Sequence, residues 1–260
     1  MIRGANGARL MEAANLLLDA RRSGEPIVDL PAALQPVDLA EAYFVQDTMA
    51  EAFGPVGGWK IGAATAEATP VFAPMPKMWI AAGGAELVDS PGSHAWRYRG
   101  LEAEIAFLIG EDLPPRATPY SREEVVAAIA SCHPAIEVLE SGLVDPVAAA
   151  KMSASADMQM HGGFVYGAAY ADWKTIDFSK ETVMIAIDGS VRVERTGSNT
   201  SGDLMRLLPY LANEGAARTG GLKAGDWITT GSWTGNEQAV AGSSVDVRFG
   251  TVGRVGLRFG

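Results

Sequence analysis

The chain has 260 residues, of which 48% are hydrophobic and 20% charged, so it is long enough to bury a substantial core. Its formal net charge of −10 argues against a nucleic-acid partner, because phosphate contacts need clustered Lys and Arg. The single cysteine, Cys132, excludes an intrachain disulfide and a thiolate metal cluster, and the absence of a signal-like or membrane-spanning apolar run predicts a cytoplasmic protein without membrane contact.

The N-terminal part of the chain predicts two helices. Apolar residues recur at helical spacing over residues 8–22 and again over residues 39–53. Glycine and proline then predict a loop over residues 54–58. We expect an N-terminal helical arm over residues 1–56 and a catalytic core over residues 57–260, which together form one cooperative unit.

Strand-like segments dominate the rest of the chain. Ser121 and Glu124 match a helix capping box, which predicts a helix that runs to about Ser131. The Asp188-Gly189 pair predicts the type I′ turn of a hairpin. Pro209 predicts a kink or a late start in a helix over residues 204–217. Further short strands are expected over residues 227–230, 244–249 and 254–259. Helices in front and strands behind predict an α+β fold with a mixed β-sheet roll or barrel-like core.

Two glutamates one residue apart, Glu102 and Glu104, lie in an apolar segment that is typical of a strand. Alternate residues of a strand share a face, so both carboxylates would point the same way. Burial makes two neighbouring like charges costly, and a divalent cation such as Mg²⁺ or Mn²⁺ would remove that cost. The alternative from spacing alone is an amphipathic edge strand that exposes one or both carboxylates to solvent.

Other polar residues lie in apolar surroundings. Glu137 is the lone charge of residues 134–139, so it is either a third metal ligand or an ion-paired residue. Lys60 is flanked by glycines and could exchange protons near a metal, or could be a surface lysine. Asp157, judged alone, is typical of a turn or helix cap. The histidines show no zinc-ligand spacing (His94, His133 and His161). His133 could carry protons near Glu137, although a structural role is favoured.

Short motifs in a fixed order resemble the fumarylacetoacetate hydrolase superfamily, on its branch of 2-keto-4-pentenoate hydratases and 4-oxalocrotonate decarboxylases. Each motif is short, but together they extend over about residues 57–260 and are specific. They are residues 58–62, 100–107, 134–137, 156–157, 211–213, 222–226 and 229–232.

The resemblance implies a function for each matched position. Glu102, Glu104 and Glu137 would bind Mg²⁺ or Mn²⁺, and Lys60 would be an acid/base or substrate-orienting group. Asp157 would lie near the site as a second catalytic residue. Substrate would be held by Thr230, Gly231 and Ser232. The resemblance also implies the family's mixed β roll, a homo-oligomer and a cytoplasmic role in aromatic-ring catabolism.

The chain departs from this branch at three places. Glu140-Ser141-Gly142 stands where the branch commonly has Asp-Ser-Arg, so an arginine that could bind substrate is missing. Met158 replaces the usual Asn. The segment between Gly62 and Gly100 differs from the family loop that covers the substrate. These changes leave the predicted metal ligands intact and bear on the choice of substrate.

The expected activity is that of a metal-dependent lyase, a hydratase acting on a 2-hydroxydienoate or 2-oxo-enoate acid such as 2-hydroxypenta-2,4-dienoate. A bound cation would stabilise the enolate that forms as protons move along the conjugated chain. A 4-oxalocrotonate-type decarboxylase and a fumarylacetoacetate or acylpyruvate C–C hydrolase are the alternatives, in that order. A non-catalytic binding or assembly member of the fold is the alternative of a different class.

Overall fold

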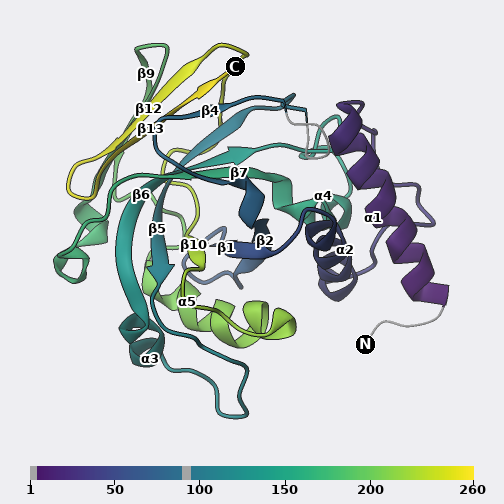
Figure 1. Cartoon of the computed structure of the whole chain (residues 1–260), viewed down its shortest axis with the longest axis horizontal. Coiled ribbons are helices and arrows are strands. Elements are labelled where there is room, and N and C mark those ends of the chain that lie inside the picture. Colours follow the sequence, from purple (N-terminus) through teal and green to yellow (C-terminus); the bar gives the residue numbers. More distant parts are fainter. Residues whose placement is uncertain (1–4, 90–94) are drawn as a thin grey trace.

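A computed structural model describes residues 5–89 and 95–260 and places them in two β-sheets and flanking helices (Figure 1). The larger sheet is mixed and has eight strands in the order β2-β1-β10-β5-β6-β7-β3, with β11 paired to β5. Its strands are β1 (Val56–Gly62), β2 (Val71–Pro76), β3 (Ile80–Ala82), β5 (Gly100–Ile109), β6 (Ile129–Leu139), β7 (His161–Tyr166), β10 (Trp227–Thr229) and β11 (Glu237–Gln238).

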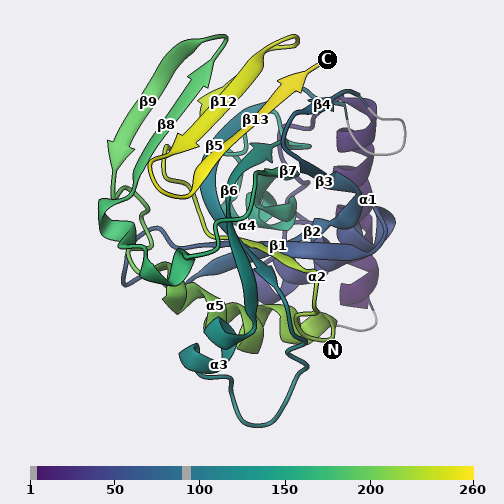
Figure 2. The same cartoon turned by 60° about the vertical axis from the view of Figure 1, so that its left-hand side comes forward.

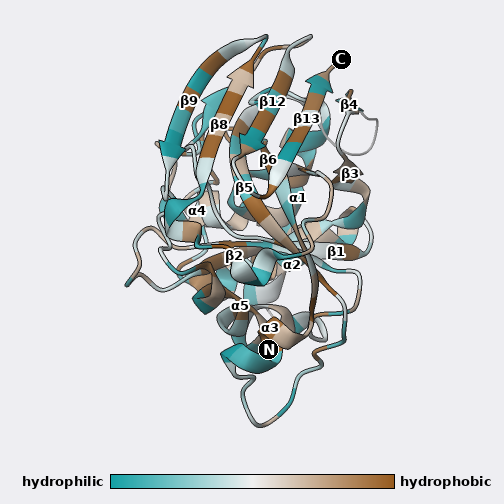
Figure 3. Ribbon diagram, turned by 90° about the vertical axis from the view of Figure 1, so that its left-hand side faces the viewer, coloured by the Kyte–Doolittle hydropathy of each residue, from teal (hydrophilic) through white to brown (hydrophobic). Residues whose placement is uncertain are grey.

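The smaller sheet has five strands in the order β4-β13-β12-β8-β9 and stands against one end of the larger sheet (Figure 2). Its strands are β4 (Ala85–Leu87), β8 (Thr182–Ile187), β9 (Ser190–Thr196), β12 (Ser244–Phe249) and β13 (Gly253–Phe259). Hydrophilic and hydrophobic residues alternate along them (Figure 3), so one face packs on a core that both sheets share. Over the described residues the sheets form an open roll and no closed barrel.

Helices α1 (Ala5–Ser23), α2 (Leu39–Ala52) and α4 (Lys151–Ala156) lie together on one side of the larger sheet (Figure 1). Their apolar faces share a second core cluster with Trp79 and Leu143, so the expected N-terminal arm packs against the rest of the chain. The division at residues 56 and 57, and cooperative unfolding as one unit, stay predictions. No helix within the described residues has both the length and the apolar character needed to cross a bilayer.

The structure corrects two local predictions. Helix α3 (Arg122–Ala127) has the expected capping box but ends early, because Ile129 begins β6 and pairs with β5. Residues 56–58 belong to β1: a Cβ on Gly58 would lie 2.4 Å from the Trp227 carbonyl oxygen, so this glycine allows close strand approach. The prediction of a kink at Pro209 agrees with the structure. Residues 204–219 form a broken helix, and Pro209 lies within its α-helical part: η5 (Leu204–Arg206), α5 (Leu207–Tyr210), η6 (Leu211–Gly215) and η7 (Ala216–Thr219).

The hairpin and the C-terminal strands lie where the sequence predicts them. Asp188 and Gly189 have φ values of 52° and 76°, the left-handed conformation that a type I′ turn needs at both central positions. Strands β8 and β9 pair on either side of this turn. Strand β9 thereby forms one edge of the smaller sheet, and β4 forms the other.

Candidate metal centre

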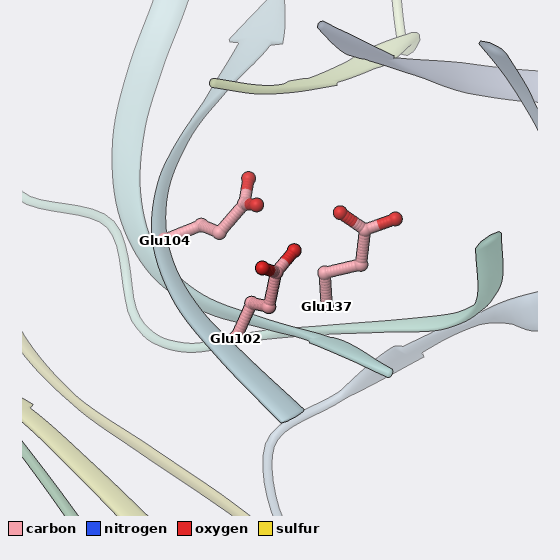
Figure 4. Close-up of side chains that lie close together, drawn as sticks. All are labelled: Glu102, Glu104 and Glu137. Carbon is pink, nitrogen blue, oxygen red and sulfur yellow. The ribbon is translucent and has the colours of Figure 1, made fainter. Parts of the chain in front are cut away.

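Three glutamates from two neighbouring strands converge at the centre of the larger sheet. Glu102 and Glu104 project from β5, and Glu137 lies directly opposite Glu102 on the antiparallel strand β6. One carboxylate oxygen from each lies within 4.8 Å of those of the other two, and the side chains point toward one another (Figure 4). Strand β5 lies between β10 and β6, so the edge-strand alternative for Glu102 and Glu104 is wrong. We call these three residues the carboxylate cluster.

The cluster has few hydrogen-bond donors for its charge. Glu104 Oε2 accepts from the Gly231 amide at 2.9 Å and from the Thr229 hydroxyl. Glu137 Oε1 accepts from Lys60 Nζ at 2.8 Å and from His161 Nδ1 at 2.9 Å. The other oxygen of Glu137, Oε2, is buried and has no hydrogen-bond partner among the described residues. A buried carboxylate oxygen without a hydrogen-bond donor is costly, and a cation ligated by this oxygen would remove that cost.

The pKa shifts of the three glutamates have two causes: the carboxylates are buried, and they share the single ammonium group of Lys60. Burial raises the pKa of Glu102 to about 7 against the opposing charge of Lys60, and repulsion from Glu137 adds to the rise. Burial and the charges of Glu137 and Glu102 raise the pKa of Glu104 well above its usual range. Burial also acts to raise the pKa of Glu137, but Lys60 and the hydrogen bond from His161 lower it to about 2. These residues suit a hard divalent cation, which would bind an oxygen of each carboxylate and offset most of their negative charge.

A cavity of about 350 Å³ opens onto the carboxylate cluster. This volume lies at the small end of the range for ligand pockets, which suits a small organic acid. Its lining residues come from both sheets and the loops between them: Lys60, Ile61, Gly62, Ala63, Val71, Glu102, Glu104, Glu137, Gln159, Arg195, Ser198, Thr200, Gly231, Ser232 and Gly235.

Lys60 projects from β1 into this cavity and does not extend over the protein surface. Its side chain is 15% exposed, and Nζ contacts Glu137 Oε1 at 2.8 Å and donates to the Gln159 carbonyl at 3.0 Å. Burial acts to lower the pKa of Lys60, but the charges of Glu137 and Glu102 raise it above its ordinary value. The surface-lysine alternative is therefore wrong.

The residues of the predicted substrate-binding segment differ in whether they line the cavity. Gly231 and Ser232 line the cavity, whereas the Thr230 hydroxyl is buried and donates to the Ile105 carbonyl at 2.6 Å. The φ of 88° at Gly231 interrupts the extended backbone, so Thr230 and Ser232 do not share a face. Substrate binding by these three residues stays a prediction. Thr229, which the sequence did not single out, contacts Glu104 instead.

Asp157 lies in a second buried group that does not line the cavity. Its Oδ1 accepts from Arg21 Nε at 2.6 Å, and its Oδ2 accepts from the Ser141 hydroxyl at 2.6 Å and the Gly142 amide at 2.9 Å. Both oxygens are engaged, so the geometry favours a positioning role over the predicted catalytic one. The nearby Glu140 carboxylate accepts from the amides of residues 97, 98 and 141. We call Arg21, Glu140 and Asp157 the arginine cluster.

The altered motif at residues 140–142 has a steric explanation in this structure. A Cβ on Gly142 would lie 3.0 Å from the Leu17 carbonyl oxygen and 3.2 Å from the Ala20 Cβ, both on α1. An arginine side chain at this position would therefore meet the backbone of α1. Arg21 of the same helix supplies the buried guanidinium that bonds Asp157.

A strained turn connects the arginine cluster to the cavity. Met158, Gln159 and Met160, which form η2, all have positive φ values, 51°, 49° and 65°. Each left-handed residue other than glycine costs about 1–2 kcal/mol, so surrounding contacts must hold the turn. Arg21 bonds the Asp157 carbonyl at 2.8 Å, and the Gln159 amide group donates to the Phe72 carbonyl at 2.9 Å. The turn presents the Gln159 carbonyl to Lys60.

The two histidines within the described residues, His133 and His161, make different contacts. His133 Nε2 bonds the Ser131 hydroxyl at 2.7 Å and Nδ1 bonds the Gly167 carbonyl at 2.8 Å, and the residue does not line the cavity. His161, which the sequence left unassigned, bonds Glu137 and is fully buried. No local pattern marks this contact, since the two residues meet only through the pairing of β6 and β7. His94 lies outside the described residues.

Comparisons with solved structures agree with this fold. The chain superimposes on 4-oxalocrotonate decarboxylase from Pseudomonas putida G7, complexed with magnesium and adipate, with a TM-score of 0.83 and 23% identity over 99% of this chain and 100% of the other. The 5-carboxymethyl-2-hydroxymuconate delta-isomerase from Mycobacterium smegmatis gives a TM-score of 0.55 and 20% identity over 79% of this chain and 80% of the other. The α+β roll predicted from the sequence is confirmed.

Sequence comparisons identify the family. A 2-hydroxyhexa-2,4-dienoate hydratase from Comamonas testosteroni is 28% identical over 158 residues, which are 61% of this chain and 59% of the relative. The chain thus matches less than two thirds of that relative's length. The family model for the C-terminal domain of fumarylacetoacetate (FAA) hydrolase matches residues 63–259, which include all three glutamates of the carboxylate cluster. The chain therefore belongs to the fumarylacetoacetate hydrolase family, as its sequence motifs predict.

Proposed function

We propose that this protein is a metal-dependent lyase that hydrates a 2-hydroxydienoate or 2-oxo-enoate acid. The observation that carries the proposal is the carboxylate cluster at the floor of a cavity, with Glu137 Oε2 buried and lacking a donor among the described residues. Glu102, Glu104 and Glu137 would hold Mg²⁺ or Mn²⁺. When bound, the cation would supply Lewis-acid stabilisation of negative charge on the 2-oxygen of a 2-oxo acid.

Residues of the protein would orient the metal-binding glutamates and transfer protons to the substrate. Thr229 and the Gly231 amide orient Glu104, and His161 orients Glu137. Lys60 holds its ammonium group between Glu137 and the Gln159 carbonyl at the cavity wall. From there Lys60 would deliver a proton to the far carbon of the dienol as it ketonises, and water would then add at the carbon conjugate to the new carbonyl.

Two related reactions are alternatives. Decarboxylation of a 4-oxalocrotonate-type acid would use the same stabilised enolate, and the neighbour with a TM-score of 0.83 carries that activity in its name. Hydrolytic C–C cleavage needs a base to activate water, and His133, the candidate for that base, is engaged with Ser131 and Gly167 away from the cavity lining. We therefore rank the hydratase first, the decarboxylase second and the hydrolase third.

A non-catalytic binding or assembly role is the competing proposal of another class. Such a role does not explain why three carboxylates that share one lysine converge in the protein interior. A cluster of this kind costs stability unless a cation offsets its charge. The 28% identical hydratase supports an enzyme. A homo-oligomer and a cytoplasmic role in aromatic-ring catabolism remain part of the proposal.

The decisive experiment supplies purified protein and Mg²⁺ with three substrates and follows the product masses. We expect 2-hydroxypenta-2,4-dienoate or a longer homologue to gain one water, and EDTA-treated protein to leave it unchanged. Loss of CO₂ from 4-oxalocrotonate would favour the decarboxylase, and cleavage of an acylpyruvate would favour the hydrolase. Metal binding without conversion of any of the three would overturn the enzymatic proposal.

A further inference from the structure

The main-chain carbonyl of Gln159 is one of two acceptors that hold the Lys60 ammonium group. Lys60 Nζ contacts Glu137 Oε1 at 2.8 Å and donates to the Gln159 carbonyl at 3.0 Å. An ammonium group carries three protons, so two fixed acceptors determine the direction of the third. No further acceptor for Nζ lies within residues 5–89 and 95–260, and Lys60 lines the cavity. The third proton is therefore available to a molecule bound there.

The carboxylate cluster attracts the same ammonium group. The negative charges of Glu137, Glu102 and Glu104 all act on Lys60. The Gln159 carbonyl has no net charge, so it can keep Lys60 in one orientation only if the carbonyl itself is held in place. The orientation of Lys60 thus depends on what fixes the backbone at Gln159.

Arg21 holds both ends of the turn at residues 158–160. Its Nη2 donates to the Asp157 carbonyl at 2.8 Å, and its Nη1 donates to the His161 carbonyl at 2.8 Å. A guanidinium is rigid and planar, and Arg21 is 1% exposed, so the two carbonyls are held at a fixed separation. The turn between them has a positive φ at each of its three residues, a conformation that is unfavourable without such contacts.

The Gln159 side chain holds the middle of the turn. Its Nε2 donates to the Phe72 carbonyl at 2.9 Å. Phe72 belongs to β2 and lies opposite Ile61, the neighbour of Lys60 on β1. Gln159 therefore makes two bonds to this pair of strands: its carbonyl accepts from the lysine, and its amide group donates to the strand beside it. The side-chain bond offsets the strain of a left-handed residue that is not glycine.

We infer that Gln159 is a positioning residue for Lys60: its side-chain bond to Phe72 holds the left-handed turn, and the carbonyl of that turn directs the ammonium group into the cavity. This inference rests on the proposed function, in which Lys60 transfers a proton. The residue at position 159 would act through the backbone conformation and not through the substrate. Asparagine adopts the left-handed conformation more readily than most residues, so it should replace Gln159 better than alanine does.

The test measures how fast the Lys60 ammonium protons exchange with water, by NMR of the full chain labelled with ¹⁵N-lysine, in the presence of Mg²⁺. Lys60→Ala identifies the signal. We expect slow exchange in the wild type and exchange about 10- to 100-fold faster in Gln159→Ala, the range for loss of a hydrogen bond to a charged group. Gln159→Asn should recover most of the protection, because it keeps the turn.

Asp188→Ala is the matched control. Asp188 has a φ of 52°, close to the 49° of Gln159, and its carboxylate accepts from the Ser243 hydroxyl and the Ser244 amide. It does not line the cavity. Its replacement also removes the contacts of a left-handed residue, so it should lower the stability without changing the exchange at Lys60. Equal acceleration in Asp188→Ala would overturn the inference, as would fast exchange in the wild type or unchanged exchange in Gln159→Ala.

Kinetics provide the second measurement. With the substrate of the proposed reaction, Gln159→Ala should lower kcat by about 10- to 100-fold and leave KM and the affinity for Mn²⁺ close to those of the wild type. An unchanged kcat in Gln159→Ala would overturn the positioning role. Because proton exchange is measured without turnover, faster exchange in Gln159→Ala of a protein that converts no substrate would contradict the proposed reaction and leave the contact between Gln159 and Lys60 standing.

Discussion

The two buried acidic groups of this protein differ in how their charges are balanced. In the arginine cluster, the oxygens of Asp157 and Glu140 all accept hydrogen bonds, and Arg21 donates to one carboxylate and three carbonyls. In the carboxylate cluster, three acids share Lys60, and an oxygen of Glu137 has no donor among the described residues. The first arrangement is complete as a structural unit, whereas the second needs another charge. The two groups therefore differ in how far hydrogen bonds and ion pairs satisfy their carboxylates, and not in burial alone.

The largest effect is expected in the arginine cluster. Asp157→Asn keeps the shape of the side chain but leaves the buried Arg21 without a counter-charge, so the free energy of unfolding should fall by about 3–5 kcal/mol. Urea denaturation would measure this loss, which should be the same with and without Mg²⁺. Asp177→Asn removes an acid from the exposed pair with Lys180 and serves as the control, with little change expected. A similar small change in both variants would contradict the structural role of Asp157.

The carboxylate cluster should behave in the opposite way. Glu104→Gln removes a repelling charge, so the metal-free variant should be at least as stable as the wild type. Saturating Mg²⁺, at 100 times its dissociation constant, should stabilise the wild type by about 2.7 kcal/mol and the variant by none. Thermal unfolding with and without Mg²⁺ checks this, and metal-dependent turnover should disappear in parallel. The exposed Glu123→Gln should keep both responses, and an unchanged Mg²⁺ response in Glu104→Gln would remove the metal assignment.

A smaller effect is expected at His161, which holds Glu137 in position. His161→Gln should weaken Mn²⁺ binding by about tenfold, the lower end of the range for residues that orient a metal ligand. His161→Asn should recover most of that loss, because its amide nitrogen can occupy the place of Nδ1. Calorimetric titration with Mn²⁺ distinguishes the variants. Equal losses in both would mean that His161 contributes packing and not the hydrogen bond.

The smallest expected effect is a pH dependence of the metal-free protein. The pKa of Glu102 is about 7 in the folded state and about 4.5 in the unfolded chain, so between these values the folded state keeps a proton that the unfolded state has lost. Stability contributed by this group is thus present below about pH 4.5 and declines as the pH rises toward 7. Denaturation across this range should show the decline in the wild type. A slope of the same size in Glu102→Gln would rule out Glu102 as its source.

The sequence predicted those parts of the fold that depend on local patterns. The Asp188-Gly189 turn and the C-terminal strands carry their own signals, since a positive φ needs particular residues and alternation marks a half-buried strand. The end of α3 was missed because pairing of Ile129 with β5 overrides helical preference. The glycines at the start of β1 predict a loop from sequence alone, because the close approach of Gly58 to Trp227 has no local signature.

The sequence indicates which charged side chains belong to the candidate site, but not the contacts that form between distant segments. The three glutamates and Lys60 are unusual charges within apolar segments, so the sequence could single them out. Thr229 and His161 were missed because their contacts exist only after distant strands pair. The carbonyl of Gln159 could not be predicted, since a main-chain group is presented by backbone conformation and not by residue type. The bond from the Thr230 hydroxyl to the Ile105 carbonyl could not be predicted either, because a family motif does not specify side-chain orientation.

The contact between Arg21 and Asp157 also bears on how the protein is made. The two residues are 136 positions apart in the chain. At synthesis rates of about 5–20 residues per second, Arg21 is complete about 7–27 s before its partner exists. Helix α1 cannot settle into its final place during that interval, and its apolar face stays open to unwanted association. A chaperone that holds the nascent N-terminal segment until residues 140–160 have been translated should therefore raise the yield of correctly assembled protein.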